Sequence, residues 1–176
     1  MVLVFQTDSA ICTNSKRRIA DFFKFSYLGA PWYHLRPELT AGNGGFSLRN
    51  QTTMRAVVAA RDWGEERLPE DVYFAEAVAE MAAAGTPGVR YPSLADARSF
   101  ALETYEDIVR AEPGDVYGIH TLYFSPPLTR GALVHKLARI CPDAIVPLYH
   151  RCVSGYSDRR VGAVTEALAH SDARPL

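Results

Sequence analysis

The order of apolar and polar positions along the chain predicts short strands that alternate with helices. Residues 2–5 (VLVF) are an apolar run of β-favouring side chains, typical of a central strand covered on both faces. From a cap at Thr13 or Asn14, apolar residues recur at helical spacing as far as Phe25, which predicts a helix. Residues 46–49 (FSLR) predict another short strand. This alternation favours an α/β fold.

Two longer helices are predicted after the strand at 46–49. Asn50 is a good N-cap for a helix over residues 51–61. Pro69 suits the first turn of the next helix, and Gly85 is expected to cap its end. The apolar residues expected on the buried faces of these helices are Met54, Val57, Val58, Phe74, Val78 and Met81.

The second half of the chain predicts shorter elements. A short helix is expected near residues 94–98, followed by a strand within 99–104. Residues 115–120 (DVYGIH) predict a short strand or loop. Beyond them, Thr129 is expected to cap one helix, and a final helix is expected at about 159–170.

Composition and charge narrow the classes of partner. The 176 residues are enough for one domain with a sizeable core. The 19 basic and 20 acidic side chains nearly cancel, so charge favours neither nucleic acid nor a membrane surface as a partner. No apolar run approaches the roughly 20 residues that span a bilayer, and the first residues lack the pattern of a signal peptide. The sequence leaves the location of the protein open.

The three cysteines, Cys12, Cys141 and Cys152, show no metal-binding spacing. Their odd number, in a chain without a signal peptide, favours reduced thiols. We therefore expect small buried hydrophobic side chains at these positions.

Asp8 follows the apolar run at 2–5, at the carboxyl end of the predicted strand. Proteins of the α/β class bind ligands at such strand ends, and a carboxylate oxygen suits a hard cation such as Mn²⁺ or Mg²⁺. A turn-forming Asp that bonds its own backbone fits the same position. The residues alone leave both interpretations open.

Two acidic residues, Glu70 and Asp71, directly follow Pro69 at the predicted start of a helix. The positive end of the helix dipole stabilises negative charge there, so a purely structural role would account for both acids. The alternative is a general base that takes a proton from an acceptor hydroxyl.

His120, a glycine-rich loop and Trp32 complete the candidates. His120 lies between apolar residues in GIHTLY, where a hydrogen-bonded core histidine and a ligand are both possible. Residues 42–45 (GNGG) match neither the dinucleotide-binding nor the P-loop motif, and a tight turn fits them as well as a ligand loop. Trp32 fits either a core aromatic or a platform for a sugar ring.

The chain resembles one family through an ordered set of motifs: VLVFQTDS, YLGAPW, GNGGFSLRN, PEDVYF, SFALET and GIH. This is the glycosyltransferase-like family catalogued as a domain of unknown function, whose members share the GAPW and GNGGFSLR signatures. That family is similar to the metal-dependent glycosyltransferases of the GT-A fold. The resemblance implies a partial GT-A-like α/β fold, a mixed sheet flanked by helices. Residues 1–125 would form its acceptor and metal side, and residues 126–176 a C-terminal helical extension.

The resemblance also implies a role for each candidate residue. Asp8 and His120 would hold Mn²⁺ or Mg²⁺, Asp71 would be the catalytic base, and Glu70 would bind or position the acceptor. The implied substrate-binding residues are Trp32, Asn43, Gly44 and Gly45. The expected reaction is the transfer of a sugar from a nucleotide sugar to a hydroxyl of a glycan or another acceptor.

The chain departs from the GT-A pattern near its N-terminus. In GT-A folds the βαβ units that hold the nucleotide precede the acidic motif, whereas here the acid is already residue 8. Without those units the strand at 2–5 is expected at a sheet edge. A fragment, a truncated gene product and a degenerate homologue all fit this departure, and for each we expect a chain that is inactive by itself. The rival hypothesis is a non-catalytic carbohydrate-binding or partner-dependent domain, and a third is a metal hydrolase.

Overall fold

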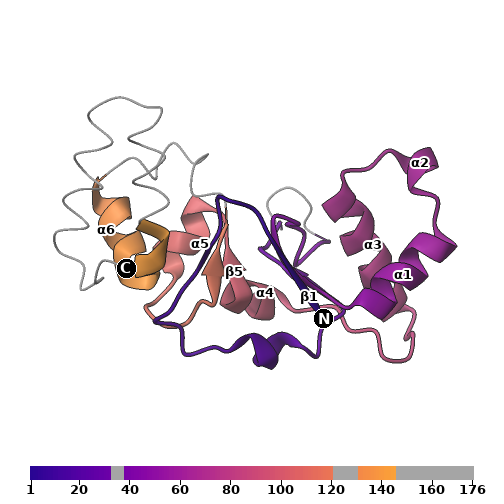
Figure 1. The fold of residues 1–176 in the computed structure, drawn as a ribbon, viewed down its shortest axis with the longest axis horizontal. Coiled ribbons are helices and arrows are strands. Elements are labelled where there is room, and N and C mark those ends of the chain that lie inside the picture. Colours follow the sequence, from indigo (N-terminus) through magenta and orange to yellow (C-terminus); the bar gives the residue numbers. More distant parts are fainter. Residues whose placement is uncertain (33–37, 121–130, 146–176) are drawn as a thin grey trace. The chain divides into compact units, whose positions relative to one another are not determined.

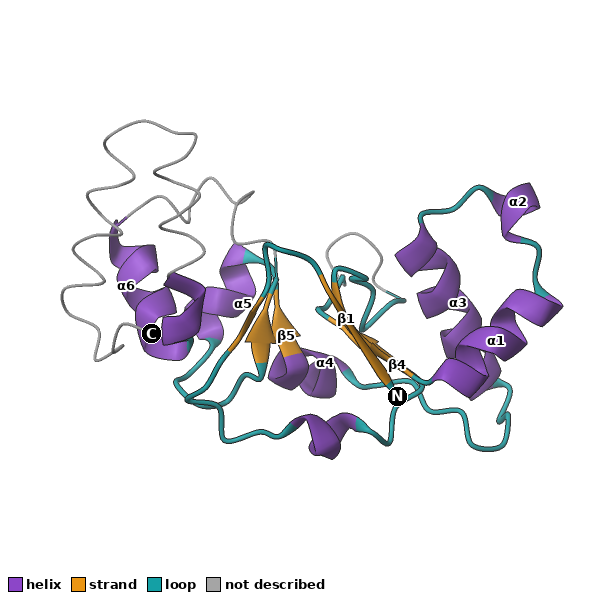
Figure 2. Cartoon of the chain, in the orientation of Figure 1, coloured by secondary structure: helices purple, strands orange, loops and turns teal. Residues whose placement is uncertain are grey.

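The structure is a computed structural model that describes three stretches of the chain: residues 1–32, 38–120 and 131–145. Figure 1 follows the chain by colour, and Figure 2 distinguishes its helices and strands. The chain divides into two compact units, each assembled from two separate stretches of sequence. Unit 1 comprises residues 1–5 and 18–101, and unit 2 comprises residues 6–17 and 102–176.

Unit 1 is built on a three-stranded antiparallel sheet. Its central strand is β4 (Phe46–Arg49), with β1 (Val2–Phe5) on one side and β3 (Tyr27–Gly29) on the other. All four residues of β4 are buried, which confirms the predicted strand. Because β4 pairs on both sides, β1 lies at the edge, and its Phe5 is 66% exposed. The prediction of a central, covered strand at 2–5 is therefore wrong, and the alternative expectation of an edge strand is confirmed.

The described part of unit 1 contains four α-helices: α1 (Gln51–Ala60), α2 (Trp63–Glu66), α3 (Glu70–Ala83) and α4 (Leu94–Phe100). The side chain of Asn50 caps α1 as predicted, because its carbonyl oxygen accepts from the amides of Thr52 and Thr53. Pro69 precedes α3, and Gly85 follows it with a positive φ of 71°. α1 packs against α3, while α3 and α4 both contact β3 (Figure 1).

The core of unit 1 lies between the sheet and these helices. Val57 and Val78 are buried there as predicted, together with Tyr27 and Tyr73. Val58 is the exception among the predicted core residues, because it is 62% exposed. Its neighbour Val57 takes the inward position at that turn of α1.

The helix predicted from Thr13 to Phe25 is replaced by a short 3₁₀ helix, η1 (Ile19–Phe22). The two expected caps have other partners. Thr13 donates from both its amide and its hydroxyl to Asp143, and the side-chain amide of Asn14 donates to the carbonyl of Arg139. These contacts hold Thr13 and Asn14 within unit 2, and tertiary hydrogen bonding thus overrides the local helical pattern.

Unit 2 contains a second small sheet and its own core. The sheet order is β2-β6-β5, formed by β2 (Ala10–Ile11), β6 (Gly118–Ile119) and β5 (Ala101–Leu102). The other elements are α5 (Tyr105–Arg110), α6 (Gly131–Ile140) and the 3₁₀ helix η3 (Pro142–Ala144). Apolar side chains of these elements form one buried cluster around Ile119 and Leu137. The chain is thus an α/β protein whose small sheets are flanked by helices, as predicted.

Some predictions lie outside the described residues. The cap at Thr129, the helix at 159–170 and the boundary between residues 125 and 126 all fall there. Among the described residues, no helix is long and apolar enough to cross a bilayer.

Cys12 and Cys141 form a disulfide within unit 2. The prediction of reduced thiols is therefore wrong at both positions, although both side chains are buried as expected. Residues 129 apart in sequence meet because β2 packs against η3, which directly follows Cys141, and their Cα atoms lie 4.8 Å apart. Cys152 lies outside the described residues.

Candidate functional site

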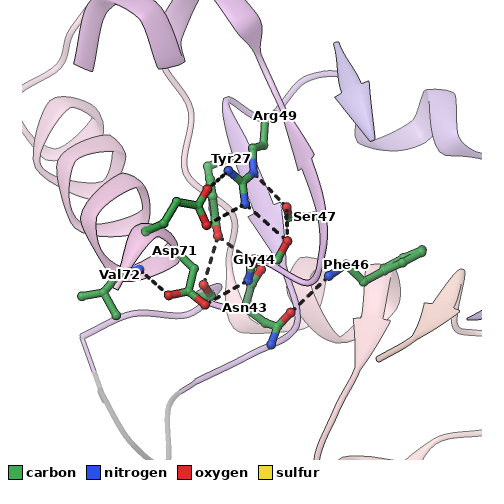
Figure 3. Close-up of polar contacts among 10 residues, drawn as sticks. Tyr27, Asn43, Gly44, Phe46, Ser47, Arg49, Asp71 and Val72 are labelled. Carbon is green, nitrogen blue, oxygen red and sulfur yellow. Dashed lines mark hydrogen bonds and ion pairs between the residues drawn. The ribbon is translucent and has the colours of Figure 1, made fainter. Parts of the chain in front are cut away.

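The loop at residues 42–45 is held by hydrogen bonds from its own surroundings. The side-chain oxygen of Asn43 accepts from the amide of Phe46 at 3.2 Å and closes the turn into β4 (Figure 3). The hydroxyl of Tyr27 donates to the carbonyls of Gly42 and Asn43 at 3.0 and 3.2 Å. Burial raises the pKa of Tyr27 well above its usual value, so the phenol keeps the proton that it donates.

The glycines near this loop are explained by close packing within the chain. A Cβ at Gly42 would come within 2.8 Å of the Trp32 ring, and a Cβ at Gly29 within 2.0 Å of the Asn43 carbonyl oxygen. Neither glycine has a positive φ, so bulk rather than backbone conformation excludes a side chain at these positions. Trp32 is half-buried against Gly42. The contact with Gly42 gives Trp32 a structural role that needs no ligand.

Arg49, the last residue of β4, links the loop to the start of α3. Its Nε donates to the Ser47 hydroxyl at 2.9 Å, and that hydroxyl donates to the Gly44 carbonyl at 2.9 Å (Figure 3). The guanidinium also forms an ion pair with Glu70 and lies 5.3 Å from the centre of the Tyr27 ring. The Arg49 side chain is only 10% exposed, whereas that of Glu70 is 52% exposed. Glu70 therefore balances a buried positive charge.

Asp71 lies in the first turn of α3, against the glycine loop. Its two carboxylate oxygens accept from the amides of Val72 at 2.9 Å and Gly44 at 3.4 Å (Figure 3). A Cβ at Gly44 would come within 2.7 Å of the Asp71 Cβ, so only glycine permits this approach. Burial raises the pKa of Asp71, the two amides oppose that rise, and the charge of Glu70 adds to it. A carboxylate with a raised pKa is suited to accept a proton.

An open cavity of about 670 Å³ adjoins this network in unit 1. It is lined by residues 58–64, which run from the last turn of α1 to the start of α2, and by Glu70, Tyr73 and Phe74 of α3. Trp63 is 55% exposed, and its indole N–H donates to the carbonyl of Leu68 at 2.8 Å. Glu70 is thus shared between the cavity wall and the ion pair with Arg49.

The second cluster of candidate residues lies in unit 2, around a buried histidine. His120 follows β6, and its Nε2 lies 3.5 Å from a carboxylate oxygen of Asp8 and 3.2 Å from the side-chain oxygen of Gln6. Its Nδ1 lies 3.5 Å from a carboxylate oxygen of Glu103. The amide of His120 donates to the carbonyl of Leu102 at 2.9 Å, which anchors the residue to β5. One imidazole therefore lies between two carboxylates.

Asp8 and His120 are two neighbouring side chains of the kinds that ligate cations. No group of three or more His, Cys, Asp and Glu side chains in the described stretches is arranged to hold a metal ion. The geometry gives the reason, because Asp8 and Glu103 lie on opposite nitrogens of the ring. A cation at Nε2 would be held by His120 and Asp8 alone, with its remaining ligands from water or substrate.

The structure brings the predicted site residues together in two groups. In unit 1, Gly44 contacts Asp71 and Glu70, while Gly45 and Asn43 are buried in the same loop. In unit 2, Asp8 lies next to His120. The predicted base and the predicted metal ligands therefore belong to different units.

Several residues of the two clusters were missed by the sequence analysis. They are Tyr27, Ser47, Arg49 and Trp63 in unit 1, and Gln6 and Glu103 in unit 2. The sequence did contain one indication of these residues. Arg49 is the last residue of a short strand that is otherwise uncharged, and a charge at that position requires a partner. Glu103 is similarly the charged residue of the predicted strand at 99–104, and it directly follows β5.

Comparison with known proteins gives one match. Neither the curated proteins nor the solved structures include a match to this chain. A family model described as "Protein of unknown function (DUF5672)" matches residues 1–120. The match spans most of the chain and includes both clusters of candidate residues. The chain belongs to the DUF5672 family.

Proposed function

We propose that this domain transfers a sugar from a nucleotide sugar to an acceptor hydroxyl with the help of a divalent cation. The proposal starts from the resemblance to GT-A glycosyltransferases. The observation that carries it is the pairing of Asp8 with His120, which are far apart in sequence and have adjacent side chains. The family resemblance had already implied that both hold one cation.

The charges around His120 favour a cation. When the Nδ1 proton is directed to Glu103, a neutral imidazole presents its lone pair at Nε2. That lone pair would face oxygens of Asp8 and Gln6, at 3.5 and 3.2 Å, where a cation could bind. The other tautomer donates from Nε2 to the same oxygens. A carboxylate behind a histidine ligand is also a common way to fix the orientation of the ring.

Mn²⁺ or Mg²⁺ would be held by Asp8 and His120, with Glu103 orienting the ring. Such an ion supplies positive charge that offsets the negative charge developing on a leaving diphosphate. Because two protein ligands make a weak site, we expect the diphosphate of the donor to complete the coordination.

Asp71 is the proposed general base in unit 1. Its carboxylate is held by the amides of Gly44 and Val72, which fix its orientation at the start of α3. Glu70 is committed to Arg49, so its proposed part is to position the first turn of α3 rather than to take the proton.

Calorimetric titration tests the proposal. Mn²⁺ should bind the wild-type chain weakly, and more tightly when uridine or guanosine diphosphate is present. Asp8→Asn should abolish both effects. The matched control is Asp115→Asn, which changes an exposed acid of the same unit that pairs with Lys16. Nucleotide binding that is independent of Mn²⁺, or Mn²⁺ affinity that survives Asp8→Asn, would refute the proposed cation site.

A further inference from the structure

The cavity in unit 1 has the size and lining of a small-molecule site. Its volume of about 670 Å³ falls within the range of ordinary ligand pockets. Its aromatic wall is formed by Trp63, Tyr73 and Phe74, and its polar wall includes Asp62 and Glu70. Mostly apolar walls with a few polar groups are typical of sites that bind an organic ring.

Trp63 presents a fixed aromatic face to this cavity. Tryptophan is usually well buried, but here 55% of its surface is exposed. Its N–H is already used by the carbonyl of Leu68, so the ring is oriented and only its faces and edges are available to a ligand. A held, exposed indole is a platform for stacking against a flat or weakly polar ring face.

The charges near the cavity disfavour an anionic ligand. Arg61 lies near Glu76 and Glu80, each with a closest distance of 3.6 Å, and Arg49 pairs with Glu70. These basic groups are thus already balanced by carboxylates, so a phosphate would find little compensation here.

Carboxylates at the cavity wall favour a ligand with hydroxyl donors. One oxygen of Asp62 accepts from the amide of Gly64 at 2.8 Å, and the Asp62 side chain is exposed. Glu70 is half exposed beside it. Carboxylate oxygens accept strong hydrogen bonds from hydroxyl groups. An exposed aromatic face beside exposed acceptors matches a neutral sugar ring, which has apolar faces and a rim of hydroxyls.

We propose that this cavity binds a neutral sugar ring stacked on Trp63, with Asp62 and Glu70 accepting from its hydroxyls. Its use as the acceptor site rests on the proposed transferase function, whereas the binding itself does not. Glu70 lies in the cavity wall next to Asp71 in sequence, which associates the cavity with the proposed base.

Ligand-observed NMR titration tests this site with methyl glucoside, methyl galactoside, methyl mannoside, N-acetylglucosamine and their common disaccharides. At least one should bind the wild-type chain without metal or nucleotide. Trp63→Ala should weaken that binding roughly tenfold, which corresponds to the energy of one aromatic stacking contact. Trp63→Phe keeps an aromatic face but loses the bond to Leu68, so it should retain most of the affinity.

Phe23→Ala is the matched control, since Phe23 is an aromatic residue of unit 1 that is 49% exposed and does not line the cavity. It should leave sugar binding unchanged. No binding by any neutral sugar, or equal binding by wild type and Trp63→Ala, would refute the sugar site.

The two proposals fail separately. Sugar binding that depends on Trp63, together with no nucleotide binding under any condition, would leave the sugar site standing and remove the transferase. That result would support the carbohydrate-binding domain considered as the rival. Metal-dependent nucleotide binding without any sugar binding would refute the sugar site and leave the transferase standing.

Discussion

The two clusters of candidate residues differ in how their negative charge is balanced. In unit 1, Glu70 is paired with Arg49, and Asp71 accepts from two backbone amides at the positive end of a helix. In unit 2, Asp8 and Glu103 lie on either side of His120, which can carry at most one positive charge. The acids of the first cluster thus meet a guanidinium and two amides, whereas those of the second meet at a single imidazole.

This difference separates two kinds of role. An internally balanced cluster is stable without a ligand, so the geometry around Asp71 explains the fold of the loop as well as it explains a base. A carboxylate beside a histidine nitrogen, as Asp8 lies beside Nε2 of His120, offers a cation an oxygen and a nitrogen ligand. The proposed cation therefore belongs to unit 2, and the role of Asp71 is decided by activity measurements.

The largest expected effect is on the transfer rate of the Asp71→Asn variant. A general base contributes about 10²- to 10⁴-fold, so in a chain that is active with a nucleotide sugar the rate should fall by that factor. The wild-type rate should also fall as the pH drops through the folded-state pKa of Asp71, which burial has raised. A rate within tenfold of wild type would show that Asp71 is not the base, and the balanced cluster would then be purely structural.

The stability of the same variant provides the control. A raised folded-state pKa means that the folded chain binds the Asp71 proton more tightly than the unfolded chain. The resulting stabilisation is complete below the unfolded-state pKa and is lost as the pH rises through the folded-state pKa. At neutral pH, Asp71→Asn should therefore leave the urea midpoint unchanged or raise it. A clear loss of stability would mean that the charged carboxylate is needed for folding.

The next largest effect should come from the disulfide in unit 2. Replacing Cys12 and Cys141 by serine removes a cross-link across a long loop, which is worth about 4 kcal/mol. Hydrogen exchange should accelerate in β2 and β6, and the amides of β4 in unit 1 should keep their protection. Wild-type protein treated with a reductant should behave like the variant. Equal acceleration of exchange in both units would show that the two units unfold together as one cooperative structure.

A smaller effect on stability is expected when either partner of the ion pair between Arg49 and Glu70 is removed. Glu70→Ala leaves a guanidinium that is only 10% exposed without its carboxylate, and should cost about 3 kcal/mol. Arg49→Met leaves a half-exposed carboxylate that water can solvate, and should cost about 1.5 kcal/mol. Urea unfolding measures both values. The control is Glu80→Ala, which changes an exposed acid of the same helix and should cost less than about 0.5 kcal/mol.

Local features of the fold were predictable because their causes are local. The cap of α1 depends on Asn50 and the amides two and three residues later, and the start of α3 depends on Pro69 and its acidic neighbours. The failures came from distant partners. Thr13 was expected to cap a helix, but it binds Asp143, 130 residues away, which no local pattern encodes.

The candidate sites show the same limit. The family resemblance implied Asp8 and His120 as ligands of one ion, whereas the residues alone left a structural role open for each. The sequence did not suggest Glu103 as the partner of His120 or Arg49 as the partner of Glu70, since these pairs depend on how separate elements pack. It also left the cavity unnoticed, because Trp63 begins a single-turn helix, α2, which is too short to show helical periodicity in the sequence.

The last prediction concerns the effect of Glu103 on metal affinity, and it tests whether the acids around His120 help to bind a cation. Glu103→Gln keeps an oxygen that can accept from Nδ1 of His120 but removes the negative charge behind the ring. We expect Mn²⁺ affinity in the presence of the nucleoside diphosphate to fall about 10- to 100-fold, as for other residues that orient a histidine ligand. Glu106→Gln, an exposed acid in the first turn of α5, should not change it. A loss as complete as that of Asp8→Asn would make Glu103 a direct ligand. Unchanged affinity would mean that its charge does not tune the ring, and Glu103 would then have no part in binding the metal.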